Sequence, residues 1–170
     1  MSRHRLAVLL AFALAAACQA EPQPRAPAPV QQTKSEQVSP LSGLPLIPLE
    51  IRSGGRTHLF MVEVARTEGE QAYGLMNRTR LGPDEGMIFP FSTPRRASFW
   101  MKDTLIPLDM IFIRADGSIA RIAASTTPRS LSPVAVGEPV AAVLEIAGGR
   151  AAALGITSTA RVSWPGGPRP

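Results

Sequence analysis

The sequence predicts a mainly β fold of the α+β class: a small mixed or antiparallel sheet or partly closed barrel with one or two short helices. Two observations lead to this prediction. Short apolar segments recur between residues 46 and 164, separated by turns that contain glycine and proline, which is typical of mainly β domains. Helical features are confined to two short stretches. Because this segment can bury a core without disulfides, we expect a single domain over residues 46–164.

The first elements are two strands and a helix. Residues 46–51 alternate apolar and other side chains, residues 53–55 turn the chain, and residues 57–65 supply a second strand, so the two strands form a hairpin. Thr67 then precedes Glu70 by three residues, the spacing of a capping box that opens a helix. The apolar side of this helix consists of Ala72, Tyr73, Leu75 and Met76.

The later elements are short strands and one more helical piece. Residues 86–91 and 97–101 are short apolar strands flanked by proline. Residues 109–114 and 118–123 form a hairpin across an aspartate-glycine turn. The remaining elements are a strand at 140–146, a short helical piece at 150–154 and a closing strand at 160–164.

The segments that flank the domain have a different character. Residues 1–18 are typical of a bacterial lipoprotein signal peptide: Arg3 and Arg5 precede an apolar run that is too short to span a bilayer and that ends at Cys18. Residues 19–45 are rich in proline, glutamine, alanine and serine, which predicts a disordered tether. We expect residues 165–170 to form a loose tail.

Cys18 decides how the protein is attached. It is the only cysteine of the chain, and a lone thiol in an exported protein invites wrong pairing unless it is lipidated. Gln19, rather than aspartate, follows it, which favours the periplasmic face of the outer membrane. The alternative is ordinary cleavage near Ala17 or Ala20, which would give a soluble periplasmic protein.

The charge of the chain is a mild basic excess. The formal net charge is +5 at pH 7, and loss of Arg3 and Arg5 with the signal peptide lowers it by two, to +3. The basic residues are spread along the chain, without the basic run or basic helix that nucleic-acid binders carry. We therefore expect no nucleic-acid partner.

Several common chemistries lack the residues that they need. No cysteine follows Cys18, which excludes a thiol nucleophile and the usual structural zinc site from the domain. His58 is the only histidine after the signal peptide, and the sequence has neither a nucleophile-elbow motif nor a glycine-rich phosphate loop. We expect no metal site and no cofactor, and we assign the methionines to the core.

The strongest positive signal is one lysine. Lys102 is the only lysine after Lys34, whereas the other basic positions of the domain hold arginine. A solitary lysine indicates a position that uses a compact point charge or a titratable amine. It lies in the segment from Phe99 to Asp109, where a dense apolar stretch gives way to a polar cluster. This segment is the leading candidate for a functional site.

The local geometry predicts which side chains share that site. Strand alternation places Trp100 and Lys102 on one face, and Asp103 and Thr104 follow at the strand end, where functional groups are often displayed. The group could bind an anionic or hydroxylated ligand over Trp100, or a desolvated Lys102 could act as a base. The alternative is a surface lysine that lies over Trp100 and a simple turn at the next two residues.

Three more charged residues are candidates for the same site. Arg78 could clamp a carboxylate through two hydrogen bonds, or it could form a surface ion pair. Asp109 could accept a hydrogen bond from Lys102 or Arg78, or it could cap a turn. Glu145 lies within an apolar run and needs a partner if it is buried, for which Arg78 or Lys102 are available; an edge-strand position is the alternative.

Several short blocks occur in a characteristic order: Gly74-Leu75-Met76, Asn77-Arg78, Leu81, residues 86–89, Phe91, residues 99–109, residues 143–146 and Gly155-Ile156. Together they resemble the uncharacterised family DUF192 (domain of unknown function 192), over about residues 46–162. The resemblance implies a compact mainly β fold with short helices, and it implies no established activity, cofactor or substrate.

Two positions depart from this family pattern. Asp103 stands where many members have asparagine, which adds a charge beside Lys102. Thr159-Ala160 replaces a glycine-aspartate pair, so any role of that aspartate is lost in this chain.

The leading hypothesis is a lipid-anchored periplasmic binding or accessory domain for a small polar or anionic ligand or an envelope glycan. Its candidate ligand-binding residues are Arg78, Trp100, Lys102, Asp103, Thr104, Asp109 and Glu145. One rival is an envelope hydrolase or lyase that uses Lys102 and a carboxylate as acid and base. Another is an assembly factor that binds a protein through the Trp100 face. An enzyme requires a lysine and a carboxylate that converge in a cleft. A binding domain requires an open concavity, and an assembly factor requires a flat apolar patch.

Overall fold

The computed structural model describes residues 37–168, so the expected signal peptide, Cys18 and most of the expected tether lie outside the described residues. The elements within this range, in chain order, are β1 (Leu46–Ser53), β2 (Arg56–Val64), α1 (Glu68–Tyr73), β3 (Glu85–Arg95), β4 (Ser98–Phe99), β5 (Leu108–Ile113), β6 (Ile119–Thr126), β7 (Val134–Ala135), β8 (Val140–Ala147), α2 (Arg150–Ala153) and β9 (Arg161–Ser163).

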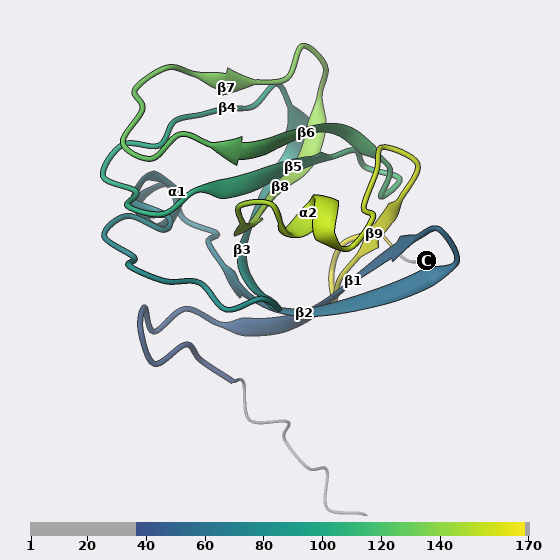
Figure 1. Ribbon diagram of the computed structural model, residues 1–170, viewed down its shortest axis with the longest axis horizontal. Coiled ribbons are helices and arrows are strands. Elements are labelled where there is room, and N and C mark those ends of the chain that lie inside the picture. The colour runs from purple at the N-terminus through teal and green to yellow at the C-terminus, as the bar shows by residue number, and fades with distance from the viewer. Residues whose placement is uncertain (1–36, 169–170) are drawn as a thin grey trace, which may run out of the picture. The chain divides into compact units, whose positions relative to one another are not determined.

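Seven strands form one mixed sheet in the order β6-β5-β8-β3-β2-β1-β9, and this sheet curls into a half-barrel (Figure 1). Neighbouring strands are antiparallel except β2 and β3, which are parallel. β4 and β7 pair separately as a short ribbon, the β4–β7 ribbon. The predicted fold class, a mainly β sheet or partly closed barrel with short helices, is therefore confirmed.

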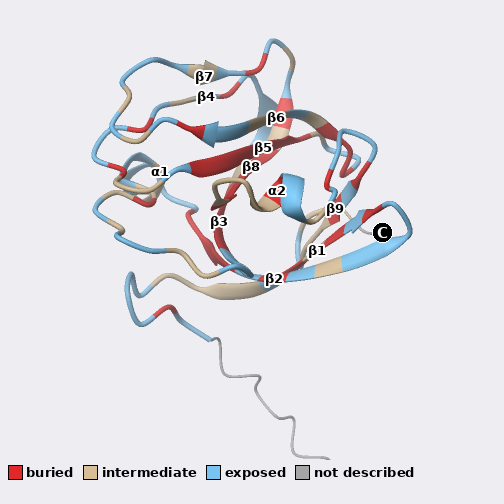
Figure 2. Ribbon diagram, in the orientation of Figure 1, coloured by how far each residue is buried: buried red, intermediate tan, exposed pale blue. Residues whose placement is uncertain are grey.

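The central strands of the sheet are buried on both faces (Figure 2). All of β5 is buried, as expected for a strand covered on either side. Because side chains alternate along a strand, Ile111 and Ile113 join one hydrophobic cluster, whereas Met110 and Phe112 join another. We call the side of the sheet that carries Ile111 the first face and the side that carries Met110 the second face.

The hairpin and the capping box predicted at the start of the domain match the structure, whereas the expected apolar side of the helix is wrong, since α1 contains no buried residue and Tyr73 is exposed. β1 and β2 form the expected hairpin, with Gly54 and Gly55 in the turn at φ of 55° and 75°, a region of φ that favours glycine. The capping box is complete, since the Thr67 hydroxyl accepts from the Glu70 amide at 3.2 Å and the Glu70 carboxylate accepts from the Thr67 amide at 2.8 Å. Neither helix in the described part of the chain has the length and apolarity needed to cross a membrane.

Three further local features differ from the expectation. The strand expected at residues 97–101 shortens to β4, because the chain turns at Lys102 and Asp103, and the Thr104 amide donates to the Met101 carbonyl at 3.1 Å. The partner strand β7 was not expected, since its two residues carry too little pattern to be recognised. The end of the expected tether, residues 37–45, forms a hydrogen-bonded turn that leads into β1.

Candidate functional site

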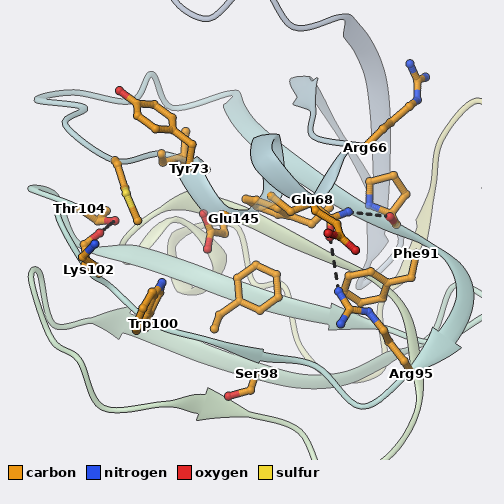
Figure 3. A pocket seen from close by; sticks show the side chains of 18 of the residues that line it. Arg66, Glu68, Tyr73, Phe91, Arg95, Ser98, Trp100, Lys102, Thr104 and Glu145 are labelled. Atoms are coloured by element: carbon orange, nitrogen blue, oxygen red, sulfur yellow. Dashed lines mark hydrogen bonds between the residues drawn. The ribbon is translucent and has the colours of Figure 1, made fainter.

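A pocket of about 660 Å³ opens on the second face of the sheet (Figure 3). α1 and the turn after it form one wall, β3 forms another, and β4 with the turn that follows it forms a third. Glu145 of β8 lies at the bottom. Four of the residues predicted from the sequence line this pocket: Trp100, Lys102, Thr104 and Glu145.

Phe99 attaches the β4 wall to the sheet. Its ring packs edge-to-face on Phe89 of β3, with ring centroids 5.0 Å apart, and on Phe112 of β5 at 6.4 Å. Edge-to-face pairs of this kind contribute about 1 kcal/mol beyond the area that they bury. Phe99 thereby fixes the position of Trp100, the next residue, at the rim of the pocket.

Trp100 and Lys102 lie together at this rim, as predicted, although both follow the end of β4 and Phe99 lines the pocket as well. Trp100 is 51% exposed, while Met101 between them is buried. The Lys102 ammonium lies 5.8 Å from the centroid of the Trp100 ring, within the range of a cation–π contact. Its ion pair with Asp103 is long, at 3.7 Å, and about half-exposed on both sides, so it contributes little stability. The ammonium therefore remains available to a ligand.

Glu145 is the unusual group of the pocket. It is only 4% exposed, and within residues 37–168 its carboxyl group has no hydrogen bond or ion pair. Its carboxyl group points into the pocket, between the rims that carry Tyr73 and Trp100 (Figure 3). Burial raises the pKa of Glu145 from 4.5 to about 8, because the charged form is poorly solvated there. The carboxyl group is therefore largely protonated at neutral pH.

The partners that the sequence suggested for Glu145 are engaged elsewhere. Arg78 donates from one guanidinium nitrogen to both carboxylate oxygens of Glu63, at 2.8 Å each. This pair is buried, with 12% and 7% of the two side chains exposed, and the Ser42 hydroxyl also donates to Glu63. Arg78 does not line the pocket. The expected pairing of Glu145 with Arg78 or Lys102 is therefore wrong, since Glu63 binds Arg78 and Lys102 lies over Trp100.

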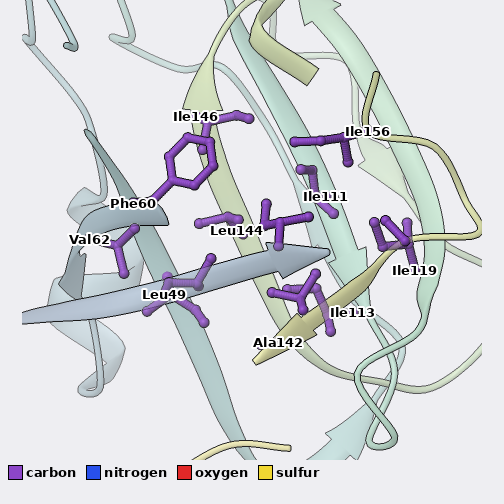
Figure 4. Packing of buried hydrophobic residues seen from close by; sticks show 14 of the residues in the cluster. Leu49, Phe60, Val62, Ile111, Ile113, Ile119, Ala142, Leu144, Ile146 and Ile156 are labelled. Atoms are coloured by element: carbon purple, nitrogen blue, oxygen red, sulfur yellow. The ribbon is translucent and has the colours of Figure 1, made fainter. Parts of the chain in front are cut away.

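Asp109 lies on the opposite side of the sheet from the pocket. It is fully buried, and strand alternation places it on the first face, which carries Ile111 and Leu144 of the cluster in Figure 4. Its carboxylate accepts hydrogen bonds from the backbone amides of Ser125 at 2.7 Å, Gly149 at 2.9 Å and Ala151 at 2.8 Å. Asp109 therefore holds the start of α2 against the end of β6. This matches the structural alternative, in which the residue caps a turn.

Asp103 and Thr104 shape the turn behind Lys102. Asp103 has a φ of 52°, a value that aspartate and asparagine tolerate better than most residues, and it does not line the pocket. Thr104 is buried, and its hydroxyl donates to the Lys102 carbonyl at 3.2 Å. The turn thus sets the direction in which Lys102 leaves the backbone.

Sequence reasoning missed the far end of the pocket. There the Arg95 guanidinium lies 4.1 Å from the centroid of the Phe91 ring and donates to the Gln71 amide oxygen at 3.4 Å. Gln71 in turn donates to the Pro90 carbonyl at 3.1 Å. Arg66 and Glu68 also line this end. No local signal marks these residues, because α1 and the irregular end of β3 meet only in the folded chain.

The described residues offer little to a metal ion. Within residues 37–168 there is no group of three or more histidine, cysteine, aspartate or glutamate side chains that could hold one. His58 lies on β2, and its Nε2 atom is buried without a hydrogen-bond partner in this range. It does not line the pocket.

Comparisons with known proteins identify the family. The family model DUF192, described as "Uncharacterized ACR, COG1430", matches residues 49–164. The chain belongs to the DUF192 family. No curated protein matches this DUF192 chain.

Two solved structures are similar to this DUF192 protein. A protein of unknown function from Novosphingobium aromaticivorans DSM 12444 is 45% identical, with a TM-score of 0.74, over 78% of this chain and 94% of that chain. A protein from Sinorhizobium meliloti 1021, described as a candidate transcription regulator, is 38% identical, with a TM-score of 0.70, over 71% of this chain and 95% of that chain.

Proposed function

We propose that this DUF192 protein is a binding domain whose second-face pocket takes a small polar or anionic molecule or part of an envelope glycan. The observation that carries the proposal is the pocket, a concavity of about 660 Å³ bordered by the half-exposed Trp100. Ligand sites are typically concave, with apolar walls and a few converging polar groups. Here the lining of the concavity combines aromatic rings with charged and hydroxyl-bearing side chains, which supports a ligand role over a flat protein-interaction surface.

The contacts that such a ligand would make follow from the geometry. The exposed face of Trp100 offers a stacking surface for a sugar ring or another flat group. The Lys102 ammonium lies beside that ring and would donate a charge-assisted hydrogen bond to an anion or hydroxyl group. The carboxyl group of Glu145 would meet the part of the ligand that enters most deeply.

A thermal-shift screen tests the proposal directly. Wild-type protein, Lys102→Ala and the control Arg80→Ala would be screened against envelope sugars, peptides, anions and metal ions. Arg80 is an exposed cation that does not line the pocket, so its loss controls for the change in net charge. We expect at least one ligand to raise the melting temperature of wild type and Arg80→Ala, and to act less on Lys102→Ala. If no ligand stabilises the wild type, the binding role is contradicted.

We also propose that the domain is lipid-anchored through Cys18 at the periplasmic face of the outer membrane. The support is the sequence: an apolar run that ends at Cys18, a following Gln19, and a proline-rich segment before the domain. Incorporation of labelled palmitate into the wild type but not into Cys18→Ser is the expected result. Incorporation that persists in Cys18→Ser would defeat the anchor and leave the soluble periplasmic alternative.

A second candidate function, an envelope hydrolase or lyase, is favoured by one observation. A buried glutamate can keep its proton near neutral pH and serve as a general acid, and burial raises the pKa of Glu145 to about 8. The acid would then be Glu145 rather than Lys102 with Asp103 or Asp109. Release of fragments from purified envelope glycan by the wild type, and its loss in Glu145→Gln, would support an enzyme. Equal release of fragments by both proteins would exclude Glu145 as the general acid.

A further inference from the structure

Glu145 offers a carboxyl group that a ligand in the pocket can contact. Its side chain is more than nine-tenths buried, it makes no hydrogen bond or ion pair within residues 37–168, and it points into an open cavity (Figure 3). Its oxygens are not among the fully enclosed, unpartnered side-chain atoms of the described residues, and the side chain lines the open pocket, where a bound molecule can reach it. An atom of a bound molecule would supply the missing partner.

The register of the sheet shows that Glu145 is not paired from within the fold. Its neighbours on the adjacent strands are Met87 and Met110, neither of which can donate a hydrogen bond. One strand beyond Met87 in the same cross-strand row lies Glu63, which has Arg78 and Ser42 as partners. The same row thus holds one carboxylate with a full set of partners and one with none.

The charges around the pocket indicate which kind of ligand it takes. Three cations line it, Arg66, Arg95 and Lys102, against Glu68 and Glu145. Because Glu145 is largely protonated at neutral pH, the lining carries a net positive charge. An anion gains from this field, whereas a ligand ammonium group would meet three like charges at the rim. The protonated carboxyl group can also donate a hydrogen bond to an anionic oxygen, which an ionised one cannot.

The uncharged lining adds a requirement for hydroxyl groups. Ser92, Thr93 and Ser98 line the cavity together with Trp100, so hydrogen-bonding hydroxyls lie near an aromatic stacking surface. This combination suits a hydroxylated ring better than an aliphatic anion. The positive charge of the lining, the buried carboxyl group of Glu145 and the stacking surface of Trp100 are together complementary to a sugar acid.

We infer that the pocket recognises a hydroxylated organic carboxylate, a uronic acid or similar sugar acid, whose carboxylate accepts a hydrogen bond from the Glu145 carboxyl group. The inference rests on the proposed function, because it names the ligand class of the same pocket. In this arrangement the ring of the ligand lies against Trp100. Lys102 beside Trp100 and Arg95 at the far end of the pocket attract the anion, and Glu145 contacts the anion at the floor.

A charge series on one sugar scaffold tests the inference by titration calorimetry. The probes are three methyl glucosides that differ only in the exocyclic carbon: the glucuronate, the parent with its hydroxymethyl group, and the aminomethyl derivative. We expect the glucuronate to bind most tightly to wild type. Its affinity should fall about tenfold between about pH 7 and about pH 9, because the protonated fraction of Glu145 falls by that factor.

Two variants isolate Glu145 from the other titratable groups of the pocket, which are Arg66, Glu68, Tyr73, Arg95 and Lys102. Glu145→Gln keeps these other titratable groups and keeps a neutral hydrogen-bond donor at the floor of the pocket. The glucuronate should still bind to this variant, but its affinity should no longer fall between about pH 7 and about pH 9. Asp84→Asn, which removes a carboxylate outside the pocket, should behave as the wild type does.

The possible results separate the inference from the proposed function. Preference for the aminomethyl probe, an affinity that rises with pH, equal binding of all three probes, or a pH dependence that survives in Glu145→Gln would each overturn the inference while leaving a ligand site in place. If none of the three probes binds, the inference also fails. The proposed function fails only if the thermal-shift panel gives no ligand as well.

Discussion

Glu63 and Glu145 occupy the same cross-strand row on the second face of the sheet, separated only by Met87. Glu63 binds Arg78 through both oxygens and accepts from Ser42, whereas Glu145 has no partner within residues 37–168 and opens into the pocket. Two chemically identical side chains on one surface therefore have opposite energetic roles. One stabilises the fold as an ion pair, and the other destabilises it when it is charged.

The first prediction concerns Glu145→Gln. The pKa of Glu145 is raised from 4.5 to about 8 by burial, so its contribution to stability is fully present below about pH 4.5 and is lost as pH rises through 8. The variant has no such loss. Its free energy of unfolding should exceed that of the wild type increasingly across this window, with an upper bound on the order of 5 kcal/mol above pH 8. Urea unfolding at a series of pH values measures this difference, and a difference that does not change with pH would contradict the assignment.

The second prediction concerns Glu63→Gln, which should act in the opposite direction. It leaves the Arg78 guanidinium buried without its counter-charge, and loss of one partner of a buried pair costs about 3 kcal/mol or more. Urea unfolding at neutral pH should show this loss. The double variant Glu63→Gln with Arg78→Met serves as the control, and it should recover part of the lost stability. A single variant as stable as the wild type would show that the pair contributes nothing.

The third prediction concerns Asp109→Asn. The substitution replaces one carboxylate oxygen with an amide that cannot accept from a backbone N–H group, and both carboxylate oxygens are used. The free energy of unfolding should fall by about 2 kcal/mol, and hydrogen exchange at Ala151 should speed up. Asp84→Asn removes an exposed partner of Arg150 and should change stability by less than about 1 kcal/mol. Equal effects of the two variants would refute the role of Asp109.

The fourth prediction compares two adjacent aromatic residues. Phe99→Ala removes the ring that packs on Phe89 and Phe112 and should cost about 3 kcal/mol of stability. Trp100→Ala removes a ring that is half in solvent and should change stability by only about 0.5 kcal/mol, while weakening any ligand found in the thermal-shift screen. Thermal unfolding of both variants checks the contrast. A larger loss for Trp100→Ala would place Trp100 in the core rather than at the site.

The sequence was informative where neighbouring residues determine the structure. The Thr67–Glu70 capping box and the glycine turn before β2 are local, and the structure contains both. The shared side of Trp100 and Lys102 also followed from alternation over three residues. The partner of Arg78 could not be predicted in this way, because Glu63 comes near it only through the parallel pairing of β2 with β3. The contacts of Gln71 and Arg95 likewise depend on how α1 packs on β3.

The pocket is built from two parts whose sequence constraints differ. Its floor belongs to the central strands β3 and β8, where a one-residue change of register would turn every buried side chain of the shifted strand to the wrong face. Much of its rim belongs to β4 and to loops, where Trp100 and Lys102 are exposed. The rim can therefore be redesigned one side chain at a time while the deep acid stays in place. A panel of rim variants on this scaffold would yield binders that share one anchoring atom and differ in selectivity.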